Sequence, residues 1–161
     1  GLQKRMCEMA LCCSGTVNGY RRRAPYTFCP INTCWGYDNR TVGIRVIEGA
    51  PSATRVEKRD AGADANPYYL LAAEIAAGLD GIEQGLAPSE ATLGNGYEEG
   101  IGDPIPTDLG TAIALARGSD WLKDVLGEMR WEMVCQQAER ELDFFSQQVT
   151  QVETDRYLRT L

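Results

Sequence analysis

The chain has 161 residues, of which 43% are hydrophobic and 24% are charged, a composition ordinary for one globular domain with a single core. A formal net charge of −7 argues against a nucleic acid as the main partner. No apolar run approaches the roughly 18 residues of a membrane-spanning helix, so we expect no membrane partner. The chain starts at Gly1 without Met or a secretory signal, which indicates a domain cut from something longer or a truncated reading frame.

The first half of the chain is expected to supply one helix and the strands of a sheet. Residues 2–13 have helical apolar character, whereas residues 16–23 are polar and basic and are expected to form a loop. Short β-forming runs cover residues 31–35 and 40–47, and a Gly/Pro/Ser turn leads to another run over 54–59. The last two runs predict an antiparallel hairpin.

The second half begins with a long predicted helix. Pro67 fits the first helical position and Asn66 is a good N-cap. Apolar residues recur along this helix at spacings of three and four, and we expect that stripe to face the core. The stripe comprises Leu71, Ile75, Leu79, Ile82 and Leu86.

Loop and further helices follow. Glycines and prolines predict a loop over residues 87–106, after which Thr107 is expected to cap a short helix and Ser119 another. The last long helix is expected to run over about 128–149, with a final turn near the C-terminus. Strands first and helices after predict an α+β fold, with antiparallel strands of the N-terminal half packed against C-terminal helices.

The chain contains six cysteines and no histidine. The cysteines show no Cys-x-x-Cys spacing, so the pattern favours reduced, mostly buried thiols and a cytoplasmic protein. A zinc site or a disulfide is the alternative interpretation. The cysteines are Cys7, Cys12, Cys13, Cys29, Cys34 and Cys135.

Long charged side chains crowd the predicted hairpin. They are Arg40, Arg45, Arg55, Glu57 and Arg59. Because side chains alternate along a strand, Arg55, Glu57 and Arg59 share one face. Such a face cannot be a dry core face unless each charge is paired, but it can line a wet cleft that binds an anion. From the residues alone, Glu57 is either part of an ion-pair ladder or a ligand of a hard cation.

Four ordered motifs carry a resemblance to a known family. They are Thr16-Val17-Asn18-Gly19-Tyr20-Arg21-Arg22, Asn39-Arg40 through Arg45, Arg55-Val56-Glu57-Lys58-Arg59, and Asn66-Pro67-Tyr68 with the later Ala77-Gly78-Leu79-Asp80-Gly81-Ile82. Together they resemble the glutamine synthetase superfamily of ATP-dependent γ-glutamyl ligases. The resemblance implies that residues 1–161 are the C-terminal portion of the catalytic domain, with a curved antiparallel sheet forming half of a funnel-shaped active site.

The resemblance also implies a nucleotide side of the site. Glu57 matches the ligand of the divalent ion, Mg²⁺ or Mn²⁺, that bridges the nucleotide phosphates. Arg40 and Arg55 match residues that contact the transferring phosphoryl group or the nucleotide, and Arg40 is the expected catalytic residue. Arg45 matches a further arginine on the phosphate side. Fixed positive charge of this kind stabilises phosphoryl transfer between anions.

On the substrate side, Arg22 and Arg59 match the pair that holds the carboxylate of L-glutamate. For Arg21 and Arg23, a solvated basic loop is an equally good interpretation. Ammonia-using members have a glutamate at the position of Phe28, where it holds and deprotonates ammonium. An apolar residue there suits an organic amine, so the chain is more similar to the γ-glutamyl–amine (polyamine-type) ligase branch.

The implied reaction joins L-glutamate to ammonia or an organic amine through γ-glutamyl phosphate, with ATP converted to ADP and phosphate. The family's paired metal-binding glutamates and a histidine-bearing strand lie upstream of the matched motifs. We therefore expect the chain to depend on the remainder of the catalytic domain and on neighbouring subunits of a homo-oligomer, and to be inactive alone. The alternative is a truncated, non-catalytic module that binds anions or a partner subunit.

Overall fold

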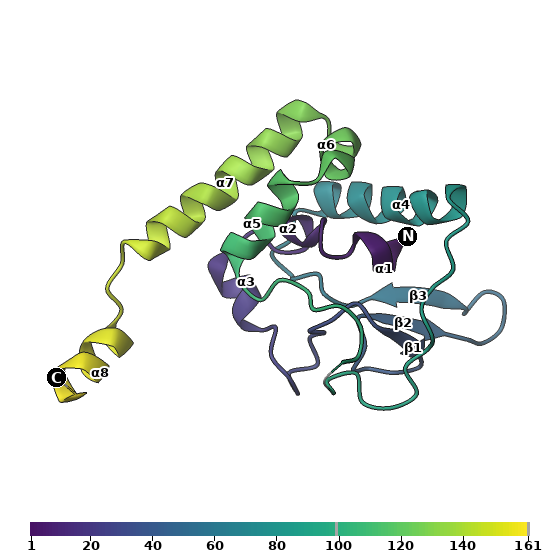
Figure 1. Cartoon of the computed structure of the whole chain (residues 1–161), viewed down its shortest axis with the longest axis horizontal. Coiled ribbons are helices and arrows are strands. Elements are labelled where there is room, and N and C mark those ends of the chain that lie inside the picture. The colour runs from purple at the N-terminus through teal and green to yellow at the C-terminus, as the bar shows by residue number, and fades with distance from the viewer. Residues whose placement is uncertain (99, 161) are drawn as a thin grey trace.

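The computed structural model describes residues 1–98 and 100–160. Figure 1 shows a layer of helices over a small sheet, with α7 leading away from the body toward α8. The elements are α1 Leu2–Arg5, α2 Ala10–Cys13, α3 Val17–Arg21, β1 Trp35–Tyr37, β2 Ile44–Ile47, β3 Arg55–Lys58, α4 Pro67–Glu83, α5 Leu109–Arg117, α6 Asp120–Leu126, α7 Glu128–Ser146 and α8 Gln151–Thr160. The α+β class is confirmed.

The sheet has the order β1-β2-β3 and is mixed. The predicted hairpin is confirmed: β2 and β3 are antiparallel, and Arg45 is the Cα partner of Glu57. In contrast, β1 runs parallel to β2 rather than antiparallel. The chain reverses at Asp38, which has a left-handed φ of 44°, and the Asn39 amide then holds the returning loop by donating to the Gly94 carbonyl at 2.8 Å.

The N-terminal segment departs from the expected single helix. Residues 2–13 form two short helices, α1 and α2, joined by a turn, and the fully buried residues lie in α2 and in the turn, which holds Met6 and Met9. The segment expected to be a basic loop contains α3, whose first turn is capped by Thr16 accepting from the Gly19 N–H. Local capping chemistry therefore stabilises helix where charge alone had indicated loop.

Most of the apolar core lies among the helices. Its buried members lie almost entirely in the helices from α2 through α7 and not in the strands between them. Tyr20, Leu109 and Leu122 are examples. The sheet has a separate, much smaller cluster made of Met6, Ile44 and Ile105. In the described part of the chain, apolar contact between the helical layer and the sheet is therefore limited to this small cluster and to Leu2, which packs against both clusters.

The apolar stripe of α4 was wrongly predicted to face the core. Its leucines and isoleucines are largely exposed, with Ile75 at 61% and Ile82 at 78%. The inward side of α4 instead carries Ala73, Ala77 and Gly81, which are fully or nearly fully buried. Because these side chains are small, the N-terminal Gly1 packs directly against the backbone of α4 at Ala77 and Gly81. The side of α4 that allows this close approach is the buried one, although the larger apolar side chains lie on the other side. The exposed stripe residues are Leu71, Ile75, Leu79, Ile82 and Leu86.

The later helix starts largely follow the predicted signals. Asn66 caps α4 and Ser119 caps α6 through their side-chain oxygens. The cap of α5 is Asp108 rather than Thr107, because the Asp108 carboxylate accepts from the Thr111 N–H at 2.8 Å. The last long helix ends at Ser146, earlier than predicted.

The predicted burial of most of the thiols is confirmed. All six cysteines are free; five are buried and Cys7 is half-buried. Across residues 1–98 and 100–160, none of the helices combines the length and apolarity that crossing a bilayer requires.

Replacing Asp108 with Ala should lower the free energy of unfolding by about 1 kcal/mol, because Thr111 loses its capping acceptor. The hydrogen bonds from Thr111 hold the pKa of Asp108 below its usual value. The stabilisation is therefore present at neutral pH and is lost as the pH falls through the folded pKa. Denaturant unfolding at neutral and acidic pH measures both effects. Thr107→Ala is the matched control and should be nearly neutral; an equal loss there would mean that the cap is misassigned.

Candidate functional site

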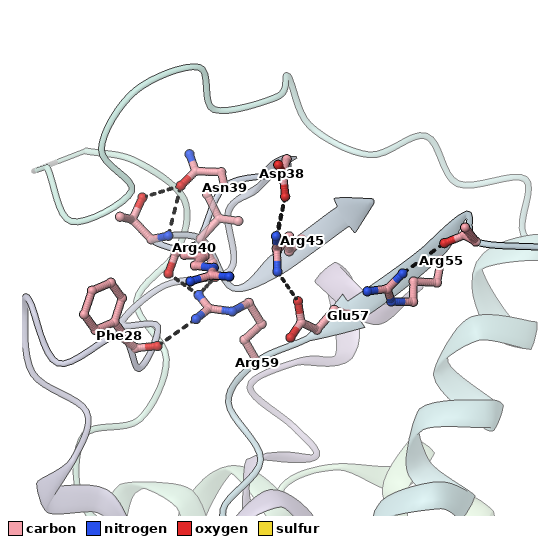
Figure 2. A network of polar contacts seen from close by, with 11 residues as sticks. Phe28, Asp38, Asn39, Arg40, Arg45, Arg55, Glu57 and Arg59 are labelled. Atoms are coloured by element: carbon pink, nitrogen blue, oxygen red, sulfur yellow. Dashed lines mark hydrogen bonds and ion pairs between the residues drawn. The ribbon is translucent and has the colours of Figure 1, made fainter. Parts of the chain in front are cut away.

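The charged face of the sheet is the one that turns away from α4. Alternation along β2 and β3 places Arg45 and Glu57 on this face, and Arg45 Nη1 donates to Glu57 Oε2 at 3.1 Å. The Arg45 guanidinium also donates through Nε to Asp38 Oδ1 at 3.1 Å, with a second, shorter contact from Nη2. Figure 2 shows Arg45 held between the two carboxylates. The ion-pair interpretation of Glu57 is thus realised in the structure.

Asp38 is a member of the site that the sequence analysis did not single out. Its hydrogen bonds with Arg45 and the charge of that residue lower the pKa of the Asp38 carboxyl. The available signal was its place directly after a strand, where Asp tolerates the left-handed backbone that reverses the chain. Asp38 is therefore both a turn residue and a counter-ion.

Arg59 joins three chain segments through one guanidinium. Its Nη1 donates to the carbonyls of Arg40 and, at 3.2 Å, Val42, and its Nη2 donates to the Phe28 carbonyl at 3.0 Å. Among the contacts in the described residues, the Nε–H and one of the two Nη2–H groups of Arg59 have no acceptor. These two neighbouring N–H groups form a fork. That fork has the geometry that binds a carboxylate in a bidentate manner.

The remaining predicted arginines are placed differently. The Arg22 Nη2 donates to the Asp60 carbonyl. The exposed Arg55 side chain points toward the hairpin turn, where its Nη1 donates to the Ala53 carbonyl at 3.0 Å. The structure thus gathers Arg40, Arg45, Glu57 and Arg59, connects Arg22 to them through the backbone after β3, and leaves the Arg55 guanidinium at the end of the hairpin.

Arg23 is not part of a solvated loop. It is 4% exposed, donates through Nη1 to the Pro106 carbonyl at 2.7 Å, and lies 4.5 Å over the Tyr20 ring. A buried guanidinium with a carbonyl and an aromatic face is a structural element. Arg21, by contrast, is exposed as the solvated-loop interpretation expects.

Phe28 lies on a strained loop at the edge of this site. Both Tyr26 and Phe28 have left-handed backbone, with φ of 64° and 59°, a conformation that costs non-glycine residues about 1–3 kcal/mol each. The Phe28 ring is 67% exposed while its carbonyl is held by Arg59. The strain is thus offset in part by Arg59, which ties the position of the loop to the arginine cluster.

Glu57 fits the chemistry of a hard-cation ligand. Magnesium in nucleotide sites is held by one or two carboxylates together with phosphate oxygens, and Glu57 supplies one half-exposed carboxylate beside cationic side chains. Its second oxygen, Oε1, takes no part in the contact with Arg45. This set fits an ion shared with a nucleotide rather than one held by the protein alone.

A second group of possible ligands, within residues 1–98 and 100–160, consists of Cys13, Asp60 and Glu74. The Lys58 ammonium already lies among them, 2.5 Å from Asp60 Oδ1, 3.0 Å from Glu74 Oε1 and 3.1 Å from Cys13 Sγ. Burial opposes the charge, but Asp60, Cys13 and Glu74 together outweigh it and raise the pKa of Lys58. A protonated amine therefore fills the place that a metal ion would need.

Two cavities flank the sheet. A polar depression of about 550 Å³ is bordered by the β1–β2 connection, including Asp38, Arg40 and Arg45. A larger one, about 1090 Å³, lies on the opposite face and is bordered by Ile44, Val46 and Val56. The larger cavity is mostly apolar, so the ion chemistry belongs to the smaller depression.

Comparison with known proteins decides the family. The family model described as glutamine synthetase, catalytic domain, matches residues 1–157. The chain belongs to this family. A glutamate–isopropylamine ligase of a Pseudomonas species is 36% identical over 153 residues, covering 94% of this chain and 33% of the relative. A glutamine synthetase of Halobacterium salinarum is 36% identical over 151 residues, covering 89% of this chain and 33% of the relative.

Solved structures share the fold of this chain. A GmaS–ADP complex superposes with a TM-score of 0.86 at 30% identity, covering 99% of this chain and 38% of that structure. The chain spans about a third of the length of the curated relatives it matches. The family and the fold predicted from the four motifs are thus confirmed.

Replacing Arg45 with Met should raise the pKa of Asp38 toward its usual value, because the neighbouring guanidinium holds it down. A pH titration of the side-chain carboxyl signals by NMR measures this directly. Arg117→Met is the control, since Arg117 binds Glu132 and Glu139 on α7 and should leave Asp38 unaffected. An Asp38 titration that is identical in wild type and Arg45→Met would mean that this contact is not kept in solution.

Proposed function

We propose that residues 1–161 form the C-terminal portion of the catalytic domain of an ATP-dependent ligase that joins the γ-carboxylate of L-glutamate to an amine. The observation that carries the proposal is one group of charged residues on one side of the sheet, in which Arg45 pairs with Glu57 and Arg59 holds the backbone of Arg40. The relatives' names, a glutamate–amine ligase and a glutamine synthetase, support the same reaction class.

In this proposal the nucleotide phosphates lie against Arg40 and Arg45, and the exposed Arg55 side chain turns from the Ala53 carbonyl to reach them. A divalent ion, Mg²⁺ or Mn²⁺, bound by Glu57 would neutralise charge on the phosphates. Arg45 is already aligned by Asp38 and Glu57, so it can exchange one carboxylate for a phosphate oxygen without reorienting. Arg40, whose side chain is exposed, would stabilise charge on the phosphoryl group during its transfer.

The substrate glutamate would be held by Arg22 and Arg59. The free fork of Arg59 suits the carboxylate, and both guanidinium groups are already fixed by carbonyl contacts. Fixed donors lose little conformational freedom on binding, which favours the oriented complex that phosphoryl transfer requires. The γ-carboxylate then accepts the phosphoryl group from ATP, ADP leaves, and the amine displaces phosphate.

For the amine, we propose an organic amine rather than ammonia. The two relatives named above are both 36% identical, so identity does not separate amine from ammonia users. The argument is Phe28, an exposed ring where ammonia-using members carry a glutamate. An alkyl amine can lie on the ring and bury apolar surface at about 25 cal/mol per Å², whereas the ring cannot accept a proton from ammonium.

The complete reaction would need more than this chain. Because the chain spans about a third of the relatives' length, we propose that the rest of the catalytic domain and neighbouring subunits complete the site, in the cytoplasm. The 161-residue chain alone should show no ATP-dependent formation of γ-glutamyl amides. Amide formation above a protein-free control that is lost in Glu57→Ala would contradict this expectation.

Nucleotide binding tests the arginine face directly. Arg40→Ala and Arg55→Ala should each weaken binding of Mg²⁺-ATP to this chain about tenfold or more, because a charge-assisted contact is worth roughly 1.5–3 kcal/mol. Isothermal titration at low and high salt measures the affinity and its screening. Arg156→Ala, an exposed arginine on α8, is the matched control and should bind as wild type does. Unchanged binding in both site variants would show that these arginines are structural.

The amine preference is tested in a full-length ligase that contains this sequence. Phe28→Glu should shift the preference from alkyl amines toward ammonia, since a carboxylate holds and deprotonates ammonium while a ring offers about 0.5–2 kcal/mol of cation–π attraction. Phe28→Leu is the control, because it keeps an apolar surface. The assay compares kcat/KM for ammonia, monoamines and polyamines. A wild type that prefers ammonia would contradict the assignment.

A further inference from the structure

The Lys58 ammonium is the centre of a buried ionic cluster that the proposed reaction does not use. The Lys58 side chain is 4% exposed and that of Asp60 is fully buried. Glu74 closes the cluster from α4, and the Cys13 thiol from the end of α2. Three acceptors from three separate segments therefore surround the three N–H groups of one ammonium.

The cluster connects parts of the fold that apolar packing joins only narrowly. The main hydrophobic cluster lies among the helices, and a small one with Leu2 and Met6 reaches the sheet at Ile44. Lys58 is the last residue of β3, and alternation directs its side chain toward α4, opposite to its neighbour Glu57. β3 carries Glu57 on its outward face, and the inward-pointing Lys58 anchors the end of this strand to α4.

The residues that follow Lys58 fix two arginines. The Asp60 carbonyl accepts from Arg22, and Arg59 lies between the two anchored residues Lys58 and Asp60. The backbone N–H of Arg59 donates to the Gly43 carbonyl at 3.0 Å, while its guanidinium reaches the carbonyls of Arg40, Val42 and Phe28. Any shift of this backbone would move both guanidinium groups.

We propose that Lys58 is a positioning residue: its ammonium fixes the backbone of residues 58–60 and thereby the direction of the Arg22 and Arg59 guanidinium groups. The positioning itself rests on contacts in this chain. Only the identity of the ligand, the carboxylate of L-glutamate, rests on the proposed function.

Positional specificity explains why an ion rather than an apolar side chain lies here. A buried ion pair is often no more stabilising than well-packed hydrophobic residues of the same volume, because desolvation opposes the Coulomb attraction. An ammonium, however, requires acceptors in defined directions. Asp60 Oδ1 contacts the Lys58 ammonium, whereas Oδ2 is buried without a hydrogen-bond partner. The contact with Lys58 therefore sets the position of the Asp60 carboxylate.

The test separates positioning from folding by comparing three variants of the 161-residue chain. Lys58→Met removes the ammonium but leaves two carboxylates facing each other, and it can unfold the chain. The neutral variant Lys58→Met/Asp60→Asn/Glu74→Gln keeps size and removes all three charges. Lys123→Met is the control, because Lys123 makes a comparable 3.0 Å contact to Glu128 on the surface.

The readout is the rate of hydrogen exchange of the arginine side-chain N–H groups, which NMR measures in the absence of ligand. In the neutral variant, exchange at Arg22 and Arg59 should become at least tenfold faster, while Arg117, bound to Glu132 and Glu139, stays unchanged and circular dichroism stays native. Unchanged exchange at Arg22 and Arg59 would overturn the proposal. So would equal acceleration at Arg117 or loss of helical signal, since Lys58 would then act on the whole fold.

A titration with L-glutamate distinguishes the positioning by Lys58 from the identity of the ligand that the two arginines bind. If wild type binds glutamate and the neutral variant binds at least tenfold more weakly, both the positioning and its ligand are supported. If wild type shows no glutamate binding while the arginine exchange still depends on Lys58, positioning stands and the proposed ligand fails. If glutamate binds equally to wild type and to the neutral variant, Lys58 does not position the binding arginines.

Discussion

The contact on which the arrangement of this chain depends is the burial of the Lys58 ammonium between Asp60 and Glu74. The main apolar cluster lies among the helices, and only a small cluster around Met6 and Ile44 joins them to the sheet, so hydrophobic burial contributes little direction to their relative placement. A buried cation at the end of β3, with acceptors from the end of α2, the loop after β3 and α4, supplies a directional link. Removing one partner would leave charge buried without compensation, which gives the link its energetic weight.

The outward face of the same strand has the opposite character. Arg45, Asp38 and Glu57 form ion pairs in which both carboxylates stay substantially exposed to water. Exposed pairs are screened and easily exchanged. The outward pairs can therefore be replaced by phosphate oxygens or a divalent ion, whereas the inward cluster stays intact. The adjacent residues Glu57 and Lys58 of β3 therefore point to opposite faces, one with exposed ion pairs and the other with a buried ionic cluster.

Arg59 connects these two faces to the loop that carries Phe28. Its guanidinium stabilises left-handed backbone that a non-glycine residue adopts only when its surroundings enforce it. The loop of Phe28 and the backbone of Arg40 are thus tied together through one side chain. In the function proposed above, glutamate bound at Arg59 would orient the Phe28 loop through this contact.

The sequence by itself determined the family, the α+β class, the β2–β3 hairpin and the caps Asn66 and Ser119, because these follow from local motifs, strand alternation and side-chain capping. It did not determine the parallel pairing of β1, the inward side of α4, or the burial of Lys58 and Arg23. Those depend on contacts between residues far apart in the chain: the small Ala77 allows close approach that larger stripe residues prevent, and a lysine becomes an internal cation only when distant carboxylates surround it. Tertiary structure decided them because burial is a property of the whole packing.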